Sequence, residues 1–552
     1  MSAPSIAITP SAYAYPLLIK QLLHTPLATN PEQEIVYADR RRHSYAEFAR
    51  RINRLGHALS RLGIKAGDTV AVMDWDSHRY LECFFAVPML GAVLQTVNIR
   101  LSPEQMLYTL NHAGADVILV NRDFLEVLAK IRPELSTVKQ FVLLADDDPV
   151  PPAGFAGEYE SLLAASPDRY DFPDFDENTR ATTFYTTGTT GLPKGVYFSH
   201  RQLVLHTLAV TSALALAPQQ GSFHRDDVYM PLTPMFHVHA WGLPYVATLA
   251  GVKQVYPGRY VPEAILKLIA RERVSFSHCV PTIMNMLLAA PYAAEVDLSG
   301  WKVIIGGSAL TSALAQAALR KGIDIFAGYG MSETGPILTL AQVAPDAAAD
   351  PGQHVATRTR TGRPIPLVDL RTVDADLQSL PRDGSSPGEV VVRAPWLTQG
   401  YLGNPEASAA LWAGGWLHTQ DVGQIGRDGY LQVTDRIKDV IKTGGEWISS
   451  LELEEVISQH PAVAEAAVIG VPDKEWGERP LALVVLNPGF IGKIGSADIQ
   501  AHVRGFVEQG RISRYGVPER VEFVEALART SVGKLNKRVM REERLGKAGG
   551  QG

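Results

Sequence analysis

The sequence predicts an α/β fold, with a large N-terminal domain of α/β layers, a β-rich subdomain and a small α/β domain at the C-terminus. Short apolar strands alternate with amphipathic helices between residues 34 and 330, which is typical of largely parallel sheets. From about Val355, alternating strands and turn signals replace that pattern. From Asp435 onward, strands and helices interleave again over a length typical of a small domain. We expect domains at 1–434, with the subdomain at about 355–434, and at 435–552.

The elements of the first region follow from local patterns. Ser44 begins a helix whose apolar residues keep helical spacing as far as Gly63. Pro103 opens another helix, with Glu104 in its first turn. Short buried strands are expected at Glu34–Ala38, Thr69–Met73, Ala92–Thr96, Ala115–Val120, Val228–Leu232, Lys253–Tyr256, Phe276–Cys279, Trp301–Ile305 and Ile323–Ala327. The segment 146–176 is rich in Asp, Pro and Gly and predicts a surface connection.

Composition excludes several classes of function. The chain has 552 residues, 46% hydrophobic and 20% charged, with a formal net charge of −6. That charge argues against a general nucleic-acid binder. Cys83 and Cys279 both have apolar neighbours, which favours buried reduced thiols over a disulfide or a nucleophile. No secretory signal or membrane-spanning run is found, so we expect a cytoplasmic protein without an integral membrane segment, for which peripheral contact stays open.

Tyr185–Gly195 reads YTTGTTGLPKG and is rich in glycine, threonine and backbone amides. Successive amides in such a turn can cradle an anion, and Lys194 adds a positive charge. The spacing is not that of a P-loop, because a proline stands where the second glycine would be. Its β-prone flanks predict two strands joined by the loop, with a helix after Ser199. The alternative is a turn without a ligand. The candidate phosphate ligands are Thr186, Thr187, Gly188, Thr189, Thr190 and Lys194.

Two further glycine-rich segments follow predicted strands, Gly306–Ser308 and Gly328–Gly335 (GYGMSETG). Ligands in open α/β sheets bind outside the carboxyl ends of the strands, so these segments and the Gly/Thr loop could line one crevice. Glu333 is a carboxylate among glycine and hydroxyl residues, and with Thr186 it would suit Mg²⁺. Taken alone, Glu333 fits a solvated loop acid better than a metal ligand.

Four other sites carry chemical groups of interest. Asp421, in HTQDVG, could accept ribose hydroxyls or simply sit in a turn. The basic, glycine-rich segment 435–447 could bind phosphate, act as a pivot or be an exposed linker. Lys534, in RTSVGKLNK, could swing into a site as a point charge or belong to a basic tail. His237 and Trp241 lie in an apolar run (MFHVHAWGLP) that also reads as core, and its histidines are not spaced with cysteines as zinc ligands.

Taken in order, YTTGTTGLPKG, MFHVHAW, GYGMSETG, QDVG, DRIKDVIKTGGEW and TSVGK resemble the adenylate-forming (AMP-binding) superfamily of acyl-CoA synthetases, non-ribosomal adenylation domains and luciferases. The resemblance covers nearly the whole chain. It implies a mobile C-terminal lid with a hinge at about Asp435, and two half-reactions. A carboxylate first attacks the α-phosphorus of ATP·Mg²⁺, giving an acyl-adenylate and pyrophosphate. A thiol or amine then takes the acyl group and AMP leaves.

The resemblance also implies roles for matched residues. Lys534 would bridge the carboxylate and the α-phosphate, and the Gly/Thr loop with Lys194 would hold the departing phosphates. We take Lys534, His237 and Glu333 as catalytic, and Thr186 and Glu333 as the Mg²⁺ ligands. The nucleotide would lie near Gly307, Gly328, Tyr329 and Ser332, with its ribose at Asp421 and Arg436, and with Lys438 and Lys442 beside the hinge.

The segments GGEWIS and MFHVHAWGLP look like those of bacterial medium- and long-chain fatty acyl-CoA synthetases. In these enzymes the residue matching Trp447 gates a fatty-acid tunnel, and those matching Val238 and Trp241 contact the acyl-adenylate. We therefore expect a fatty acyl-CoA synthetase that uses ATP, Mg²⁺ and CoA, as a homodimer. The alternatives are a CoA ligase for a short, branched, methylthio-propionate-like or bulky polycyclic acid, and a degenerate nucleotide-binding protein. Gln420 departs from the usual glycine before Asp421, which could weaken nucleotide affinity.

Overall fold

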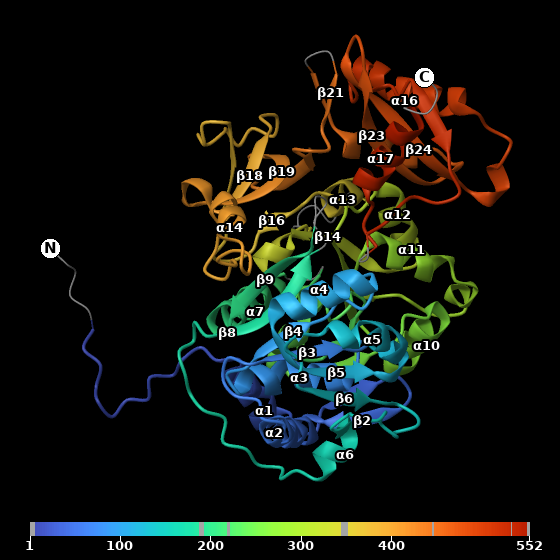
Figure 1. Cartoon of the computed structure of the whole chain (residues 1–552). Helices are drawn as coiled ribbons and strands as arrows, with labels where there is room; N and C mark the ends of the chain where they lie inside the picture. The colour runs from blue at the N-terminus through green and yellow to red at the C-terminus, as the bar shows by residue number, and fades with distance from the viewer. Residues whose placement is uncertain are drawn as a thin grey trace.

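The computed structural model describes residues 6–186, 192–217, 221–343, 351–443, 446–530 and 533–548. Within these ranges the strands form two large sheets, a smaller antiparallel sheet and a separate C-terminal sheet. Figure 1 shows the two large sheets in the blue-to-green body, with the smaller sheet and the red C-terminal domain above it. The α/β fold class and the small C-terminal domain are as predicted.

The first large sheet ends at the Gly/Thr loop. Its order is β7-β6-β5-β3-β4-β8-β9, parallel throughout except for the last pair. In that antiparallel pair Thr186 faces Lys194, so the loop joins two strands as predicted. The strands are β3 (Thr69–Met73), β4 (Val93–Thr96), β5 (Ala115–Asn121), β6 (Gln140–Leu144), β7 (Gly157–Glu158), β8 (Arg180–Thr186) and β9 (Lys194–Ser199).

The second large sheet presents the carboxyl ends of its parallel strands to the site. Its order is β16-β15-β14-β13-β12-β10-β11-β1-β2, with parallel pairing from β14 to β1 and antiparallel pairing at both edges. The strands are β1 (Glu34–Tyr37), β2 (Arg41–Ser44), β10 (Val228–Pro231), β11 (Lys253–Tyr256), β12 (Phe276–Cys279), β13 (Lys302–Ile305), β14 (Asp324–Gly330), β15 (Ile337–Leu340) and β16 (Arg363–Pro364).

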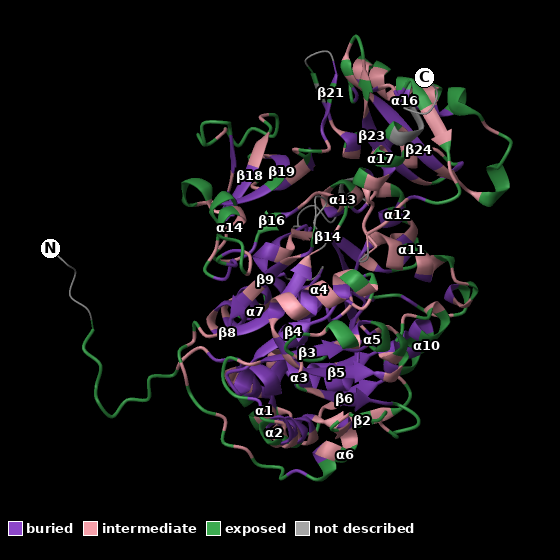
Figure 2. Cartoon of the chain, in the orientation of Figure 1, coloured by how far each residue is buried: buried purple, intermediate pink, exposed green. Residues whose placement is uncertain are grey.

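Helices cover these sheets, and buried residues fill the strands and the inner helix faces (Figure 2). Ser44, Ser77, Ser102 and Ser199 each accept a hydrogen bond from a backbone amide in the first turn of the helix that follows, which fixes where those helices begin. The helices are α1 (His24–Thr29), α2 (Tyr45–Arg61), α3 (His78–Met89), α4 (Pro103–Ala113), α5 (Leu125–Ile131), α6 (Tyr159–Ala164), α7 (His200–Ala215), α8 (Val238–Trp241), α9 (Leu243–Ala250), α10 (Pro262–Glu272), α11 (Pro281–Ala289), α12 (Ser312–Arg320) and α13 (Pro351–Arg358).

The smaller sheet and the C-terminal sheet are adjacent in sequence. The smaller one, β17-β18-β19-β20, is antiparallel. The chain leaves it at Arg436 and enters the C-terminal sheet, β22-β21-β24-β23 with β25 beside β24, at Ile441. The elements are β17 (Asp369–Val373), β18 (Gly388–Arg393), α14 (Pro405–Leu411), β19 (Leu417–Ile425), β20 (Leu431–Arg436), β21 (Ile441–Thr443), β22 (Glu446–Ile448), α15 (Ser450–Ser458), β23 (Val463–Asp473), β24 (Gly477–Leu486), α16 (Ser496–Glu508), β25 (Arg520–Phe523) and α17 (Lys537–Ala548).

Two sequence expectations are wrong in detail. The segment 146–176 is not only a surface connection, because it contains β7 and α6, where Tyr159 and Leu163 are buried. The β-rich pattern does not begin at Val355, which lies in helix α13, and the antiparallel sheet starts only at β17. In both places a short element is stabilised by distant packing partners, which local pattern does not reveal.

Candidate functional site

A narrow cavity lies where the carboxyl ends of β13 and β14 meet the C-terminal domain. Its volume is about 20 Å³, room for one or two water molecules. It brings together eight of the predicted site residues, although they come from distant parts of the sequence. These are His237, Val238, Trp241, Gly307, Gly328, Tyr329, Ser332 and Lys534.

Lys534 enters this cavity from the loop between β25 and α17. Its Cε lies 3.0 Å from where a β-carbon on Gly307 would stand, so the glycine makes room for the lysine. Desolvation in the cleft, helped by the charge of Arg436, lowers the pKa of Lys534 to about 8, against the opposing effect of Asp421 and Glu333. An ammonium group that has lost water in this way gains most from an anionic ligand.

Asp421 lies beside the cavity on β19, opposite Arg436 of β20. The Tyr329 hydroxyl donates to Asp421 Oδ2 at 2.7 Å, and Arg436 Nε lies 3.3 Å from Oδ1. Burial raises the pKa of Asp421, while Arg436 opposes the rise. The sequence placed this residue between strands, whereas the structure places it inside β19, in register with Arg436 and just before a register shift at Val422–Gly423. It keeps acceptor capacity for a pair of hydroxyls.

Glu333 is buried and is joined to the Gly/Thr hairpin through Tyr401. The Tyr401 hydroxyl donates to Glu333 Oε1 at 2.8 Å, and Lys194 Nζ lies 4.6 Å from the centre of the Tyr401 ring. The backbone of Tyr401 forms a bridge with Val196 of β9. Tyr401 was missed from the sequence, where its only signal is an aromatic residue in the turn-rich segment TQGYLGNP.

The donor set around Glu333 fits Mg²⁺. Thr186 ends β8 directly opposite Lys194, on the hairpin that Tyr401 connects to Glu333. A buried carboxylate and a hydroxyl are hard oxygen ligands, and Mg²⁺ completes its octahedron with water and phosphate oxygens. Glu333 and Thr186 could therefore hold the metal that accompanies a nucleotide.

The segment that carries His237 and Trp241 has an unusual backbone. Val238, His239, Ala240 and Trp241 have φ between 48° and 59°, so four consecutive non-glycine residues form a left-handed turn. Each costs about 1 kcal/mol or more relative to a right-handed turn. Such strain is kept where the surroundings over-determine it, often at ligand-binding positions. The turn places His237, Val238 and Trp241 in the cavity wall.

Two buried residues that the sequence did not single out anchor this turn. Asp76 accepts a hydrogen bond from the Met235 amide at 2.8 Å, and the Thr96 hydroxyl donates to the Phe236 carbonyl at 2.9 Å. Burial raises the pKa of Asp76 to about 7. Burial, with a smaller effect of Lys534, lowers the pKa of His237 to about 3, so that imidazole is neutral at pH 7.

The loop that carries Lys534 touches the N-terminal domain through a small set of contacts. Arg529 donates to Thr282 Oγ1 at 2.6 Å, to the Gly533 carbonyl at 2.9 Å and to Glu465 at 2.7 Å. Thr282 in turn donates to the Gly533 carbonyl at 3.2 Å. Nearby, Glu455 accepts from the backbone amide of Ser312 at 3.2 Å.

The remaining predicted residues lie elsewhere. Lys438 and Lys442 follow the predicted hinge and do not line the cavity. Asp435 holds the start of α15, because it accepts from the Ser450 amide at 2.6 Å and its hydroxyl at 2.7 Å. The other predicted residues lie outside the described part of the chain, namely Thr187, Gly188, Thr189, Thr190 and the side chain of Trp447.

Glycine-rich ends of parallel strands, with a lysine of the C-terminal domain in the cavity beside them, are the features expected of the adenylate-forming class. Comparison with known proteins agrees. The family described as AMP-binding enzyme matches residues 23–402, and its C-terminal domain matches residues 452–534. The chain belongs to this family.

Curated relatives place it among the acyl-CoA ligases of that family. It is 40% identical to the long-chain-fatty-acid–CoA ligase of Thermus thermophilus, over 91% of this chain and 90% of that one. It is 39% identical to the 3-methylmercaptopropionyl-CoA ligase of Ruegeria pomeroyi, over 91% of each. It is 36% identical to the medium-chain-fatty-acid–CoA ligase of Ectopseudomonas oleovorans, over 91% and 90%.

Solved structures share the whole architecture. An anthranilate CoA ligase in complex with anthranoyl-AMP matches with a TM-score of 0.84 at 25% identity, over 97% of this chain and 99% of that one. ATP-bound MatB from Rhodopseudomonas palustris matches with a TM-score of 0.80 at 26% identity, over 95% and 98%. Within the described residues, the helices are all too short or too polar to cross a membrane.

Proposed function

We propose that this protein activates a medium- to long-chain fatty acid as an acyl-adenylate, using ATP and Mg²⁺, and transfers the acyl group to CoA. The observation that carries the proposal is the position of Lys534, in one cavity with Gly307, Gly328 and Tyr329. A cation delivered there by the C-terminal domain can lie between two anions that would otherwise repel each other.

In the proposed first step, a carboxylate oxygen attacks the α-phosphorus and the bond to pyrophosphate breaks. Protonated Lys534 offsets the repulsion between the acid and the α-phosphate, while Lys194 lies on the side of the leaving phosphates. Asp421 would accept the ribose hydroxyls, and Glu333 with Thr186 would hold Mg²⁺, whose charge would offset that of the phosphates. Positioning and electrostatics suffice for this chemistry, without an enzyme nucleophile.

In the second step, the CoA thiol attacks the acyl carbon and the bond to AMP breaks. The thiol comes with the co-substrate, which agrees with the state of the two cysteines. Cys83 and Cys279 are buried, and burial raises the pKa of both thiols. Neutral His237 can donate one hydrogen bond to the acyl oxygen, since His237 lines the same cavity as Lys534.

The acyl group is the least constrained part of the proposal. Val238, Trp241 and Ile304 give the cavity an apolar wall, and relatives named for long- and medium-chain fatty acids support a fatty acid. A short thioether acid is the second candidate. It is supported by the 39% identity to a 3-methylmercaptopropionyl-CoA ligase.

A panel of carboxylates tests both candidates. Pyrophosphate release is measured with acids from 3-methylmercaptopropionate to C16 fatty acids, with and without CoA. We expect the highest kcat/KM with C8–C16 acids and CoA-dependent turnover. Highest activity with the thioether acid would select the second candidate, and turnover only with an amine acceptor would overturn both. The proposed homodimer is checked by sedimentation of the same preparation.

A further inference from the structure

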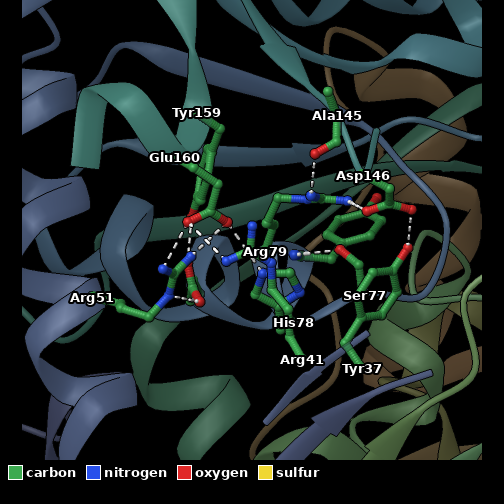
Figure 3. A network of polar contacts seen from close by, with 12 residues as sticks. Tyr37, Arg41, Arg51, Ser77, His78, Arg79, Ala145, Asp146, Tyr159 and Glu160 are labelled. Atoms are coloured by element: carbon green, nitrogen blue, oxygen red, sulfur yellow. Dashed lines mark hydrogen bonds and ion pairs between the residues drawn. The ribbon is translucent and has the colours of Figure 1, made fainter. Parts of the chain in front are cut away.

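A second group of chemically competent side chains lies between β2 and α3 and shares no residue with the cavity that holds Lys534. Figure 3 shows this buried polar network, with His78 and Glu160 near its centre. His78 and Glu82 are four residues apart on α3, so they lie on the same helix face. His43 approaches from β2. One ligand atom from each of His43, His78 and Glu82 lies within 4.8 Å of the others.

Both histidines present a buried ring nitrogen that has no hydrogen-bond partner. These atoms are Nε2 of His43 and Nδ1 of His78. The His78 side chain is only 1% exposed. A buried nitrogen without a partner costs about 1–3 kcal/mol, so a ligand bound by these two nitrogens would remove that cost.

The other ring nitrogen of His78 is held in the manner typical of metal-bound histidine. Nε2 lies 3.3 Å from Oε1 of Glu160. A carboxylate at that nitrogen fixes the proton there and leaves the lone pair on Nδ1, which is the tautomer a metal ligand needs. Arg51 and Arg41 hold Glu160 in turn, with Arg51 Nη1 at 2.8 Å and Arg41 Nη1 at 3.6 Å.

Glu82 has three donors already. Its Oε1 accepts from Arg51 Nε at 2.7 Å, and its Oε2 accepts from the Tyr159 hydroxyl at 2.6 Å and from Arg51 Nη2 at 3.3 Å. Each carboxylate oxygen has two lone pairs, so Oε1 keeps one of them for a metal ion.

We propose that His43, His78 and Glu82 bind one divalent transition-metal ion, with Zn²⁺ the best fit to two imidazole nitrogens and one carboxylate oxygen. Water completes such a three-ligand site. Ligands at 2.0–2.1 Å from zinc stand roughly 3.3–3.5 Å apart, so the distances between the three ligand atoms, which reach 4.8 Å at most, must shorten by up to about 1.4 Å for the three ligands to bind one ion. The ion would tie β2 to α3 and stabilise the N-terminal domain, far from the acyl chemistry.

The neighbouring guanidinium groups set an upper limit on affinity. Arg51 already forms ion pairs with the carboxylates of Glu82 and Glu160 and offsets their negative charge. Arg79 pairs with Asp146 at 2.6 Å in the same network (Figure 3). A metal ion is therefore bound less tightly than in a closed four-ligand site. A buried water between the two orphaned nitrogens is the competing occupant.

Zinc binding to tag-free protein tests the proposal. Chelator-treated protein is titrated with Zn²⁺ against a chromophoric competitor in the absence of ATP, and retained metal is counted after gel filtration. We expect one equivalent per chain and a rise in Tm. His43→Gln should weaken zinc binding at least about tenfold, in line with the loss of a ligand or its support, while pyrophosphate release stays unchanged.

His57→Gln is the matched control, because His57 is a histidine of the same domain whose ring bonds a carbonyl outside the cluster. It should bind zinc like the parent protein. His78→Asn, with folding checked by circular dichroism, should abolish binding even if His43→Gln retains part of it. No retained zinc in the parent protein, or equal binding in all three variants, would overturn the site and leave water as the occupant.

Discussion

On the N-terminal side of the cleft, hydrogen bonds and ion pairs fix the charged side chains, which lie on or next to strands. Asp421 has Tyr329 and Arg436 as partners, and Glu333 is linked through Tyr401 to the hairpin of Lys194. On the C-terminal side, Lys534 stands on a loop. That loop meets the opposite domain through Arg529, Thr282 and Gly533.

We propose that this difference separates groups that are fixed before substrate binds from a lysine that the C-terminal domain delivers and withdraws. The fixed side would hold nucleotide and metal through both half-reactions. The delivered cation matters only while the acid and the α-phosphate meet. Substitutions on the loop should therefore slow adenylate formation and leave thioester formation largely unchanged. Substitutions on the strands should weaken nucleotide binding as well.

Lys534→Ala should have the largest effect. Loss of a charge that acts on the transition state costs about 10²–10³-fold in rate, here in acid-dependent pyrophosphate release. Thioester formation from a supplied acyl-adenylate should change little, because the phosphate is then the leaving group. Stopped-flow or quenched assays of each half-reaction measure both rates. Equal losses in the two steps would remove the proposed role of Lys534.

Glu333→Gln tests the fixed side. The amide keeps the size and the contact with Tyr401 but removes the metal-binding charge, so adenylate formation should fall by about 10²-fold. The Mg²⁺ concentration for half-maximal rate should rise at the same time. Rates measured across a Mg²⁺ titration distinguish this result from a purely structural defect, which would lower the rate at every concentration equally.

The pH profile of adenylate formation should report Lys534. Its pKa is lowered to about 8 in the folded protein, so the lysine is charged below pH 8 and neutral above it. The rate should fall about tenfold for each pH unit beyond the pKa. Thioester formation should lack this alkaline limb. The arginine side chain in Lys534→Arg stays charged. The activity that this variant retains should therefore not fall at alkaline pH.

Arg529→Gln tests the contact that holds the loop. Hydrogen bonds to a charged group contribute about 1.5–3 kcal/mol, so adenylate formation should fall roughly ten- to a hundredfold while thioester formation is preserved. Arg538→Gln is the matched control, because Arg538 lies on α17 of the same domain and pairs only at the surface, 3.4 Å from Glu542. A loss of the same size in both half-reactions would mean that Arg529 serves folding alone.

The residues that line the cleft were easier to predict from the sequence than the contacts that hold them in place. Glycine-rich strand ends indicated the segments that hold Gly307 and Gly328, and the family resemblance, not the local pattern, placed Lys534 with them; the structure brings all three into one cavity. Tyr401 was not predicted, since its role depends on contacts with Glu333, 68 residues away, and with Lys194. These are long-range facts that one sequence does not contain.

The strained backbone of Val238–Trp241 could not be predicted from the sequence either. Nothing in MFHVHAWGLP indicates that four consecutive residues, Val238–Trp241, adopt left-handed values, because only His239 is of a type enriched there. The anchors come from the first large sheet and the segment beside it, since Thr96 ends β4 and Asp76 follows β3. Helix α13 and helix α6 were missed for the same reason, since each is short and depends on its tertiary setting.

Gln420→Gly should have the smallest effect, and it tests the fixed side where the sequence departs from the usual glycine. Gln420 has φ of 61°, a conformation that glycine adopts without strain. Its side-chain amide donates to Glu389 at 3.2 Å and is exposed. Because relief of strain exceeds the added chain entropy, we expect a gain of about 0.5–1 kcal/mol in stability, measured as a small rise in Tm.

The KM for ATP distinguishes an effect of Gln420 on the backbone alone from the expected weakening of nucleotide binding. If the side chain only reaches Glu389, the KM for ATP should be the same in Gln420→Gly and in the parent protein. Gln420→Ala is the control, because alanine removes the amide but keeps the strained backbone, so its Tm should not rise. A lower KM for ATP in both variants would show instead that the glutamine side chain obstructs the ribose site beside Asp421.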